Sequence, residues 1–227
     1  MNDGVRGARR SPGRADWAVP RRRMVERLAA AGIHDRRVLA ALEAVPRHLL
    51  VPDALQAQAY RDAALPIGDG QTISAPGTVA AMSQALALRG HESVLEIGTG
   101  SGYQAAILSQ LAARVISVER VQRLAATARS SLDRLGIHNV LVYWGDGTRG
   151  RPADAPFDAI VVTAGGPQVP EPLLEQLAVG GCLVGPFGTR AEQRLVRVRR
   201  DSPHAWSQEL LGRARFVDLV GSHGWSA

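Results

Sequence analysis

The sequence predicts an α/β fold built on a doubly wound, mostly parallel sheet, with helices before it and an antiparallel edge at its C-terminal end. Three observations carry this prediction. Short strands alternate with helices from residue 93 onward, these strands are near-continuous apolar runs, and the chain ends on consecutive strand-like segments. Apolar runs of this kind are typical of parallel strands that are covered on both faces.

The segment before the sheet is predicted to be mainly helical. From Met24, apolar residues recur at three- and four-residue steps, which indicates two short helices. Gly32 separates these helices and Pro46 ends the second one. Residues 65–77 are dense in Gly and Pro and are expected to form a loop, and a further helix is expected over 79–88.

The alternating segment predicts five strands and the helices that connect them. Strands are expected at 93–97, 115–119, 140–144, 157–163 and 182–186. Helices are expected at 103–113, 121–135 and 170–177, with Gly136 just past the end of the second. The antiparallel edge is expected to pair residues 194–199 with residues 214–220.

Composition excludes several classes of protein. The 227-residue chain has no stretch of about 18 apolar residues, so no membrane span is expected. Its basic N-terminus has no apolar segment behind it, which argues against a secretory signal. The single cysteine, Cys182, excludes an internal disulfide and a multi-cysteine zinc site, and the histidines are scattered. We therefore expect a cytoplasmic protein without a metal, in which Cys182 is buried.

Positive charge is concentrated at the N-terminus. Residues 1–23 hold seven arginines and two acids, whereas the rest of the chain holds twenty arginines and nineteen acids. Residues 1–20 are therefore expected to form a disordered, Arg-rich tail, and residues 21–227 a single domain. Within that domain we expect N-terminal helices and a loop over 21–90, the ligand-binding core over 91–190, and C-terminal strands and a tail over 191–227.

A glycine-rich loop is the sharpest local feature. It follows a predicted strand and opens a predicted helix, the context that a nucleotide-binding turn needs. Its residues are Glu96, Ile97, Gly98, Thr99, Gly100, Ser101 and Gly102. Glu119 ends the next strand, 21 residues after Gly98, where a carboxylate can accept from ribose hydroxyls.

Two classes of ligand compete for this loop. A dinucleotide prefers G-x-G-x-x-G, whereas the spacing here is G-x-G-x-G, and a carboxylate at Glu96 would repel a pyrophosphate. The same carboxylate would attract the ammonium and sulfonium of S-adenosylmethionine. Asp146, in the turn with Gly147 after the third strand, is placed to accept from the adenine amine. The loop and the three acids together favour S-adenosylmethionine.

Several motifs outside this loop give the chain a family resemblance. They are PRHLLVP (46–52), ALPIG (64–68), GQTISAP (70–76), VLEIGTGSGYQAAILSQL (94–111), GDGT (145–148), APFDAIVVTAG (155–165), VPEPLLEQL (169–177) and GSHGW (221–225). Over residues 24–225 the chain resembles the protein-L-isoaspartate O-methyltransferases. GQTIS is the most specific of these motifs, because generic methyltransferases lack it.

The resemblance implies a Rossmann-like class I methyltransferase fold and a repair activity. The family methylates the free α-carboxylate of L-isoaspartyl residues in damaged proteins and peptides, and the ester then collapses to a succinimide. It implies Ser74 as the active-site serine, with Gln71, Thr72 and Ile73 of the same loop at the substrate. Thr163, at the end of the fourth strand, is expected to border the cofactor, and the segment ending in Gly224 and Trp225 to close over the site.

Alternatives to this reading remain open. The chain departs from the family at Gly77 and at Gly165-Gly166, which bears on fine substrate preference more than on the reaction. A related enzyme with one dedicated peptide substrate is the first alternative. A nucleic-acid methyltransferase or binding protein that uses the basic tail is the second. We do not expect nucleic acid as a partner, because the body of the chain is near neutral and residues 163–166 carry no Asn-Pro-Pro-Tyr-type motif. A structural protein that keeps only a cofactor pocket is the third.

Overall fold

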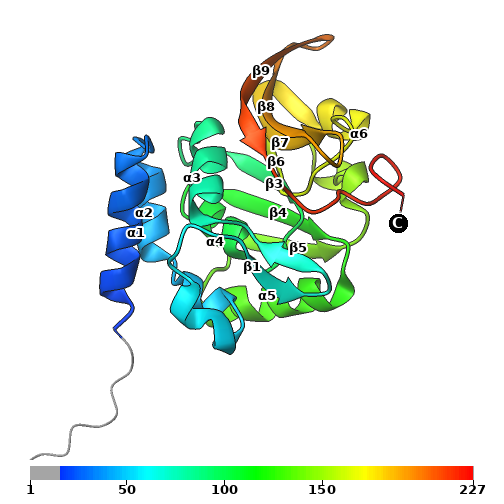
Figure 1. Ribbon diagram of the computed structural model, residues 1–227. Helices are drawn as coiled ribbons and strands as arrows, with labels where there is room; N and C mark the ends of the chain where they lie inside the picture. Colours follow the sequence, from blue (N-terminus) through cyan, green and yellow to red (C-terminus); the bar gives the residue numbers. More distant parts are fainter. Residues whose placement is uncertain (1–15, 227) are drawn as a thin grey trace, which may run out of the picture.

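The computed structural model describes residues 16–226, which form a seven-stranded sheet flanked by helices (Figure 1). The strand order is β5-β4-β3-β6-β7-β8-β9. The strands are β3 (Ser93–Ile97), β4 (Arg114–Glu119), β5 (Val140–Trp144), β6 (Phe157–Val162), β7 (Leu177–Gly188), β8 (Gln193–Ser202) and β9 (Ala205–Ala214). Strands β3 to β7 are parallel to one another, and β8 and β9 are antiparallel additions.

The strand order reverses between β3 and β6. From β3 the chain steps outward to β4 and then β5, and it returns to place β6 on the other side of β3. Loops leaving the two sides of such a switch point diverge and open a crevice at the carboxyl ends of the strands. The predicted fold is therefore confirmed, and it fixes where a ligand can bind.

Helices cover the sheet unequally on its two faces. The connecting helices of the first half are α4 (Tyr103–Ser109) and α5 (Gln122–Arg134), and α6 (Glu171–Glu175) precedes β7. One apolar cluster joins the first face to the N-terminal helices, α4 and α5. A second cluster, which includes Phe157, Leu173 and Leu177, fills the face toward α6. Both faces are buried over the central strands, which explains their continuous apolar runs, whereas Leu141 and Trp144 of the edge strand β5 are exposed.

The N-terminal helices pack beside and outside α4 on the first face (Figure 1). They are α1 (Ala18–Ala30), α2 (Arg36–Ala44) and α3 (Pro76–Ala85). The Asp35 side chain caps α2 by accepting from the backbone N–H of Arg37 at 2.8 Å. Because α1 begins at Ala18, the prediction of a disordered tail over 1–20 is wrong for residues 18–20, and its residues 1–15 lie outside the described part of the chain.

Two further local predictions are wrong. The segment 65–77 is not a simple loop, because β1 (Leu65–Gly68) and β2 (Gln71–Ile73) pair in an antiparallel hairpin. The strand that pairs with β8 is β9 at Ala205–Ala214, and residues 215–220 contribute isolated bridges only. Most of β9 is exposed on this edge, so its sequence lacks the apolar alternation that would reveal a strand.

Two negative findings hold for residues 16–226. No helix there has the length and apolar character needed to cross a bilayer. No group of three or more His, Cys, Asp or Glu side chains is placed to hold a metal ion in the same residues. Cys182 is buried, as predicted, and it is a free thiol.

Candidate active site

A pocket opens at the carboxyl ends of the parallel strands, where the sheet order reverses. Its empty space is about 800 Å³ when the open mouth is included. Eleven predicted site residues line it: Gln71, Thr72, Ile73, Ser74, Gly98, Thr99, Gly100, Ser101, Glu119, Gly147 and Thr163. The structure thus joins the hairpin loop, the glycine loop and three strand ends in one cavity.

The glycine loop has a backbone that only glycine adopts easily. Gly98 and Gly100 have φ of +96° and +53°, in the left-handed region. A Cβ on Gly98 would lie 2.5 Å from the hydroxyl oxygen of Thr163. That hydroxyl is 2.6 Å from the carbonyl oxygen of Gly98 and 2.9 Å from that of Ile97, so Thr163 fixes the loop from the neighbouring strand.

Glu119 is built into the same loop. One carboxylate oxygen accepts from the backbone N–H of Gly100 and the other from that of Val121, each at 2.8 Å. The residue is 6% exposed and lines the pocket. Each oxygen has a second lone pair, so Glu119 keeps acceptor capacity for a ligand hydroxyl.

Glu96 does not line the pocket. Its side chain is fully buried behind the loop, where Ser117 donates to it and Ser117 in turn contacts Thr99 at 2.5 Å. Burial raises the pKa of Glu96 to about 8, the nearby Glu119 carboxylate adds to this, and the Ser117 hydrogen bond opposes it. The side chain is therefore mainly neutral at pH 7, which undercuts the expectation that its charge attracts the ligand.

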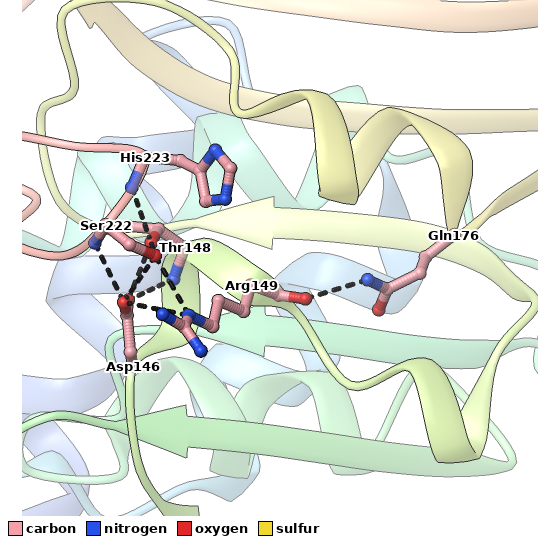
Figure 2. A network of polar contacts seen from close by, with 6 residues as sticks. All are labelled: Asp146, Thr148, Arg149, Gln176, Ser222 and His223. Carbon is pink, nitrogen blue, oxygen red and sulfur yellow. Dashed lines mark hydrogen bonds and ion pairs between the residues drawn. The ribbon is translucent and has the colours of Figure 1, made fainter.

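Gly102 and Asp146 also lie outside the lining. Gly102 precedes α4 with φ of +85°, a backbone conformation that favours glycine, and it lies next to Ala128 and Leu132 of α5. The Asp146 carboxylate is turned toward the C-terminal segment and bonds Thr148 and Ser222 (Figure 2). Only the backbone turn at Gly147 reaches the pocket wall.

The hairpin side of the pocket is more open. Ser74 and Thr72 line both the pocket and a wider groove beside it. That groove continues over Asp62, Arg213 and Arg215, which come from two separate parts of the chain. Within residues 16–226 no hydrogen bond occupies the Ser74 hydroxyl, so it is free to contact a ligand.

Sequence reasoning missed two parts of this site. Gln104 lines the pocket, its amide donates to Ser83 at 2.9 Å, and its buried Oε1 has no partner within residues 16–226. Residues 217–220 of the C-terminal segment form one wall. Gln104 lies inside the 94–111 motif, but its residue type and spacing gave no sign of a role in the pocket, and residues 217–220 were expected to form a strand.

The switch-point pocket and its glycine loop define the class: an S-adenosylmethionine-dependent methyltransferase. A family model described as "Protein-L-isoaspartate(D-aspartate) O-methyltransferase (PCMT)" matches residues 20–224. The chain belongs to this family.

Relatives and solved structures agree with this assignment. "Protein-L-isoaspartate O-methyltransferase 1" of Syntrophobacter fumaroxidans is 58% identical over 90% of this chain and 96% of its own. "Protein-L-isoaspartate O-methyltransferase 2" of Geotalea uraniireducens is 56% identical over 92% of this chain and 96% of its own. A solved structure named protein-L-isoaspartate O-methyltransferase has a TM-score of 0.82 at 30% identity, over 90% of this chain and 67% of that one. The predicted family, fold class and cofactor are thereby confirmed.

A structure from Plasmodium falciparum supports the fold alone. It has a TM-score of 0.77 at 24% identity, and the alignment covers 88% of this chain and 98% of that one. That protein was solved in complex with S-adenosyl-L-homocysteine.

Proposed function

We propose that this chain transfers the methyl group of S-adenosylmethionine to the α-carboxylate of L-isoaspartyl residues in damaged proteins and peptides. Family membership supports the reaction. One observation about this chain carries the proposal furthest. The GQTIS hairpin, which marks the family, forms the boundary between the pocket and the groove beside it, with Thr72 and Ser74 lining both.

The residues present fit S-adenosylmethionine. The left-handed glycines let the loop backbone approach a ligand closely, and Glu119 has spare lone pairs for ribose hydroxyls. The unpartnered Oε1 of Gln104 is a buried acceptor without a donor, and the ammonium of the cofactor would supply one. We assign the cofactor to the pocket lining around Gly98, Thr99, Gly100, Ser101, Glu119, Gly147 and Thr163.

The chain itself needs to supply little acid–base chemistry. When bound, S-adenosylmethionine provides an activated methyl group and a neutral leaving group. A carboxylate with a pKa near 4 is already ionised at pH 7, so the acceptor requires no general base. The protein must orient the acceptor oxygen and exclude water from it.

The loop Gln71–Ser74 is placed to orient that acceptor. The Ser74 hydroxyl is uncommitted within the described residues and can donate to one carboxylate oxygen. Ile73 is 3% exposed and anchors the loop in the core, so it positions Ser74 through packing. The groove beside Ser74 is open enough to carry the flanking polypeptide.

We propose that the substrates are general damaged proteins in the cytoplasm, and not one dedicated peptide or a nucleic acid. Deleting residues 1–15 would test the tail: we expect peptide methylation to persist. Transfer of methyl groups to RNA would contradict the assignment.

The reaction is tested with radiolabelled S-adenosylmethionine and matched peptides that differ only in carrying isoaspartate or normal aspartate. Base-labile methyl ester on the isoaspartyl peptide alone is the expected result. Label on neither peptide, with cofactor binding intact, would refute general isoaspartyl methylation and favour a dedicated substrate. Testing several isoaspartyl peptides of unrelated sequence separates those two substrate classes.

A further inference from the structure

Asp146 sits at the centre of a polar network that ties the C-terminal segment to the turn after β5 (Figure 2). Its Oδ1 accepts from the backbone N–H of Thr148 at 2.9 Å and from the hydroxyl of Thr148 at 2.6 Å. Its Oδ2 accepts from the backbone N–H of Ser222 at 2.8 Å and from the hydroxyl of Ser222 at 2.9 Å. Four donors from two distant segments therefore converge on one carboxylate.

These four bonds exhaust the ordinary acceptor capacity of the group. A carboxylate has about four lone-pair sites, two on each oxygen. Arg149 adds an ion pair at 3.7 Å to Oδ2. Partial burial would raise the pKa of Asp146, but the hydrogen bonds from Ser222 and Thr148 outweigh burial and hold that pKa below its usual value. The carboxylate is thus ionised and committed, and the residue is absent from the pocket lining.

The C-terminal segment fits tightly where it meets Asp146. A Cβ on Gly221 would lie 2.1 Å from Oδ1 of Asp146, so only glycine permits this approach. Two residues after Gly221 also bind to other parts of the chain. The backbone N–H of His223 donates to the Thr148 hydroxyl at 3.1 Å, and the indole N–H of Trp225 donates to the Gly165 carbonyl at 2.9 Å. These contacts hold the segment in place just after residues 217–220, which form one wall of the cofactor pocket.

We propose that Asp146 is a positioning residue, which latches the C-terminal segment 217–225 over the pocket and so supports cofactor binding through that segment, not through contact with adenine. The inference rests on the proposed cofactor site. If the pocket wall exists only while the segment is docked, the apparent affinity falls in proportion to the docked fraction. Loosening the latch from either side must then have the same consequence.

Two full-length variants loosen the latch from opposite sides. Asp146→Asn places an amide donor against the donors of Ser222 and Thr148, and Gly221→Ala pushes a methyl group against the unaltered carboxylate. We expect each to raise the Kd for S-adenosylhomocysteine, measured by calorimetry, by about tenfold, the scale of one charged hydrogen bond. Ser226→Ala, at an exposed residue beyond the latch, is the matched control.

The double variant separates the latch from a direct contact. If each single change already undocks the segment almost completely, the double variant binds about as weakly as the weaker single variant. Faster amide hydrogen exchange at Ser222 and Trp225 should accompany each change. An unchanged Kd in Asp146→Asn, or a weaker Kd without faster exchange at Ser222 and Trp225, would overturn the proposal.

A second ligand tests adenine directly. S-inosylhomocysteine carries a carbonyl oxygen in place of the adenine amine. A latch predicts that wild type and Asp146→Asn discriminate between the two ligands by the same ratio, whereas a direct contact predicts that the variant loses its discrimination. All these measurements use cofactor products without peptide, so a failure of isoaspartyl methylation would leave them interpretable.

Discussion

The two sides of the pocket are built differently. On the cofactor side, the loop after β3 is held by its own backbone angles, by Thr163 and by the doubly bonded Glu119. On the acceptor side, a short hairpin presents Ser74 to an open groove, and its hydroxyl has no partner among residues 16–226. One side is fixed before any ligand arrives, and the other offers uncommitted groups.

This contrast has a physical consequence. A preorganised site loses affinity when its backbone is disturbed, because fixed donors and dipoles cannot relax without cost. An open site loses only the interactions that the removed group makes with the substrate. Substitutions on the cofactor side should therefore act on binding and stability, and those on the acceptor side on turnover and peptide affinity.

The largest effect is expected from Gly98→Ala. Alanine at this position is strained for two reasons. The backbone has a left-handed φ, and the new Cβ would lie 2.5 Å from the hydroxyl oxygen of Thr163. We expect a loss of about 3 kcal/mol or more, divided between unfolding free energy and cofactor affinity. Calorimetry with S-adenosylhomocysteine and urea denaturation measure the two parts.

Gly136→Ala is the matched control for that change. Gly136 has a similar φ of +69°, but a Cβ there meets nothing within 4 Å. It should cost about 1 kcal/mol of stability and leave cofactor affinity unchanged. If both variants bound cofactor equally well, the glycine loop would not be the rigid half of the site.

The next effect concerns Glu96 and depends on pH. Its pKa of about 8 in the folded chain lies above the ordinary value of 4.5, so the folded state holds a proton that the unfolded state releases. The free energy of unfolding should therefore fall as pH rises from 4.5 to about 8. This group contributes a slope of up to about 1.4 kcal/mol per pH unit.

Glu96→Gln should remove that slope. The amide keeps an acceptor for Ser117 and cannot ionise. Denaturation curves of both proteins at several pH values between 5 and 8 should converge at the acidic end and separate at the basic end, with the variant more stable. Parallel curves would mean that Glu96 is charged in the fold, as the sequence argument assumed.

Glu119→Gln should weaken cofactor binding by about 2 kcal/mol. The change removes the charge that strengthens hydrogen bonds to ribose, and it turns an amide donor toward the backbone N–H of Gly100 or Val121. Calorimetry with S-adenosylhomocysteine provides the value. An unchanged Kd would remove Glu119 from the proposed cofactor contacts.

Ser74→Ala should act on the other side of the site. We expect turnover of an isoaspartyl peptide to fall roughly tenfold, equal to one lost hydrogen bond of about 1.4 kcal/mol. The Kd for S-adenosylhomocysteine should stay within about twofold of wild type, since Ser74 makes no bond that shapes the glycine loop. A matching loss in both quantities would give Ser74 a structural role.

The smallest effect is expected from the groove. Arg213 and Arg215 are exposed, line the groove and form no ion pair within residues 16–226. Changing both to Gln should raise KM about threefold for isoaspartyl peptides with acidic flanking residues, the scale of exposed charge pairs. Peptides with neutral flanks serve as the control, and added salt should shrink the difference. Equal effects on both peptides would argue against charge recognition.

The parallel half of the sheet was predictable from the sequence. Strands β3 and β5 begin and end at the predicted residues, because buried apolar runs bounded by glycine or charge are a local signal. The β1–β2 hairpin was missed because its strands are four and three residues long and partly exposed. Strand β9 was missed for the related reason that an exposed edge has no apolar period.

The sequence alone determined the family, the position of the glycine loop and the residue types that surround the ligand. These follow from short motifs whose backbone geometry is dictated by neighbouring residues, as at Gly98. Only the tertiary structure decided what the acids do. Glu119 reaches the pocket, Glu96 is buried and mainly neutral at pH 7, and Asp146 turns to the C-terminal segment. The charge and direction of a carboxylate depend on burial and on donors more than 70 residues away along the chain, such as Ser222.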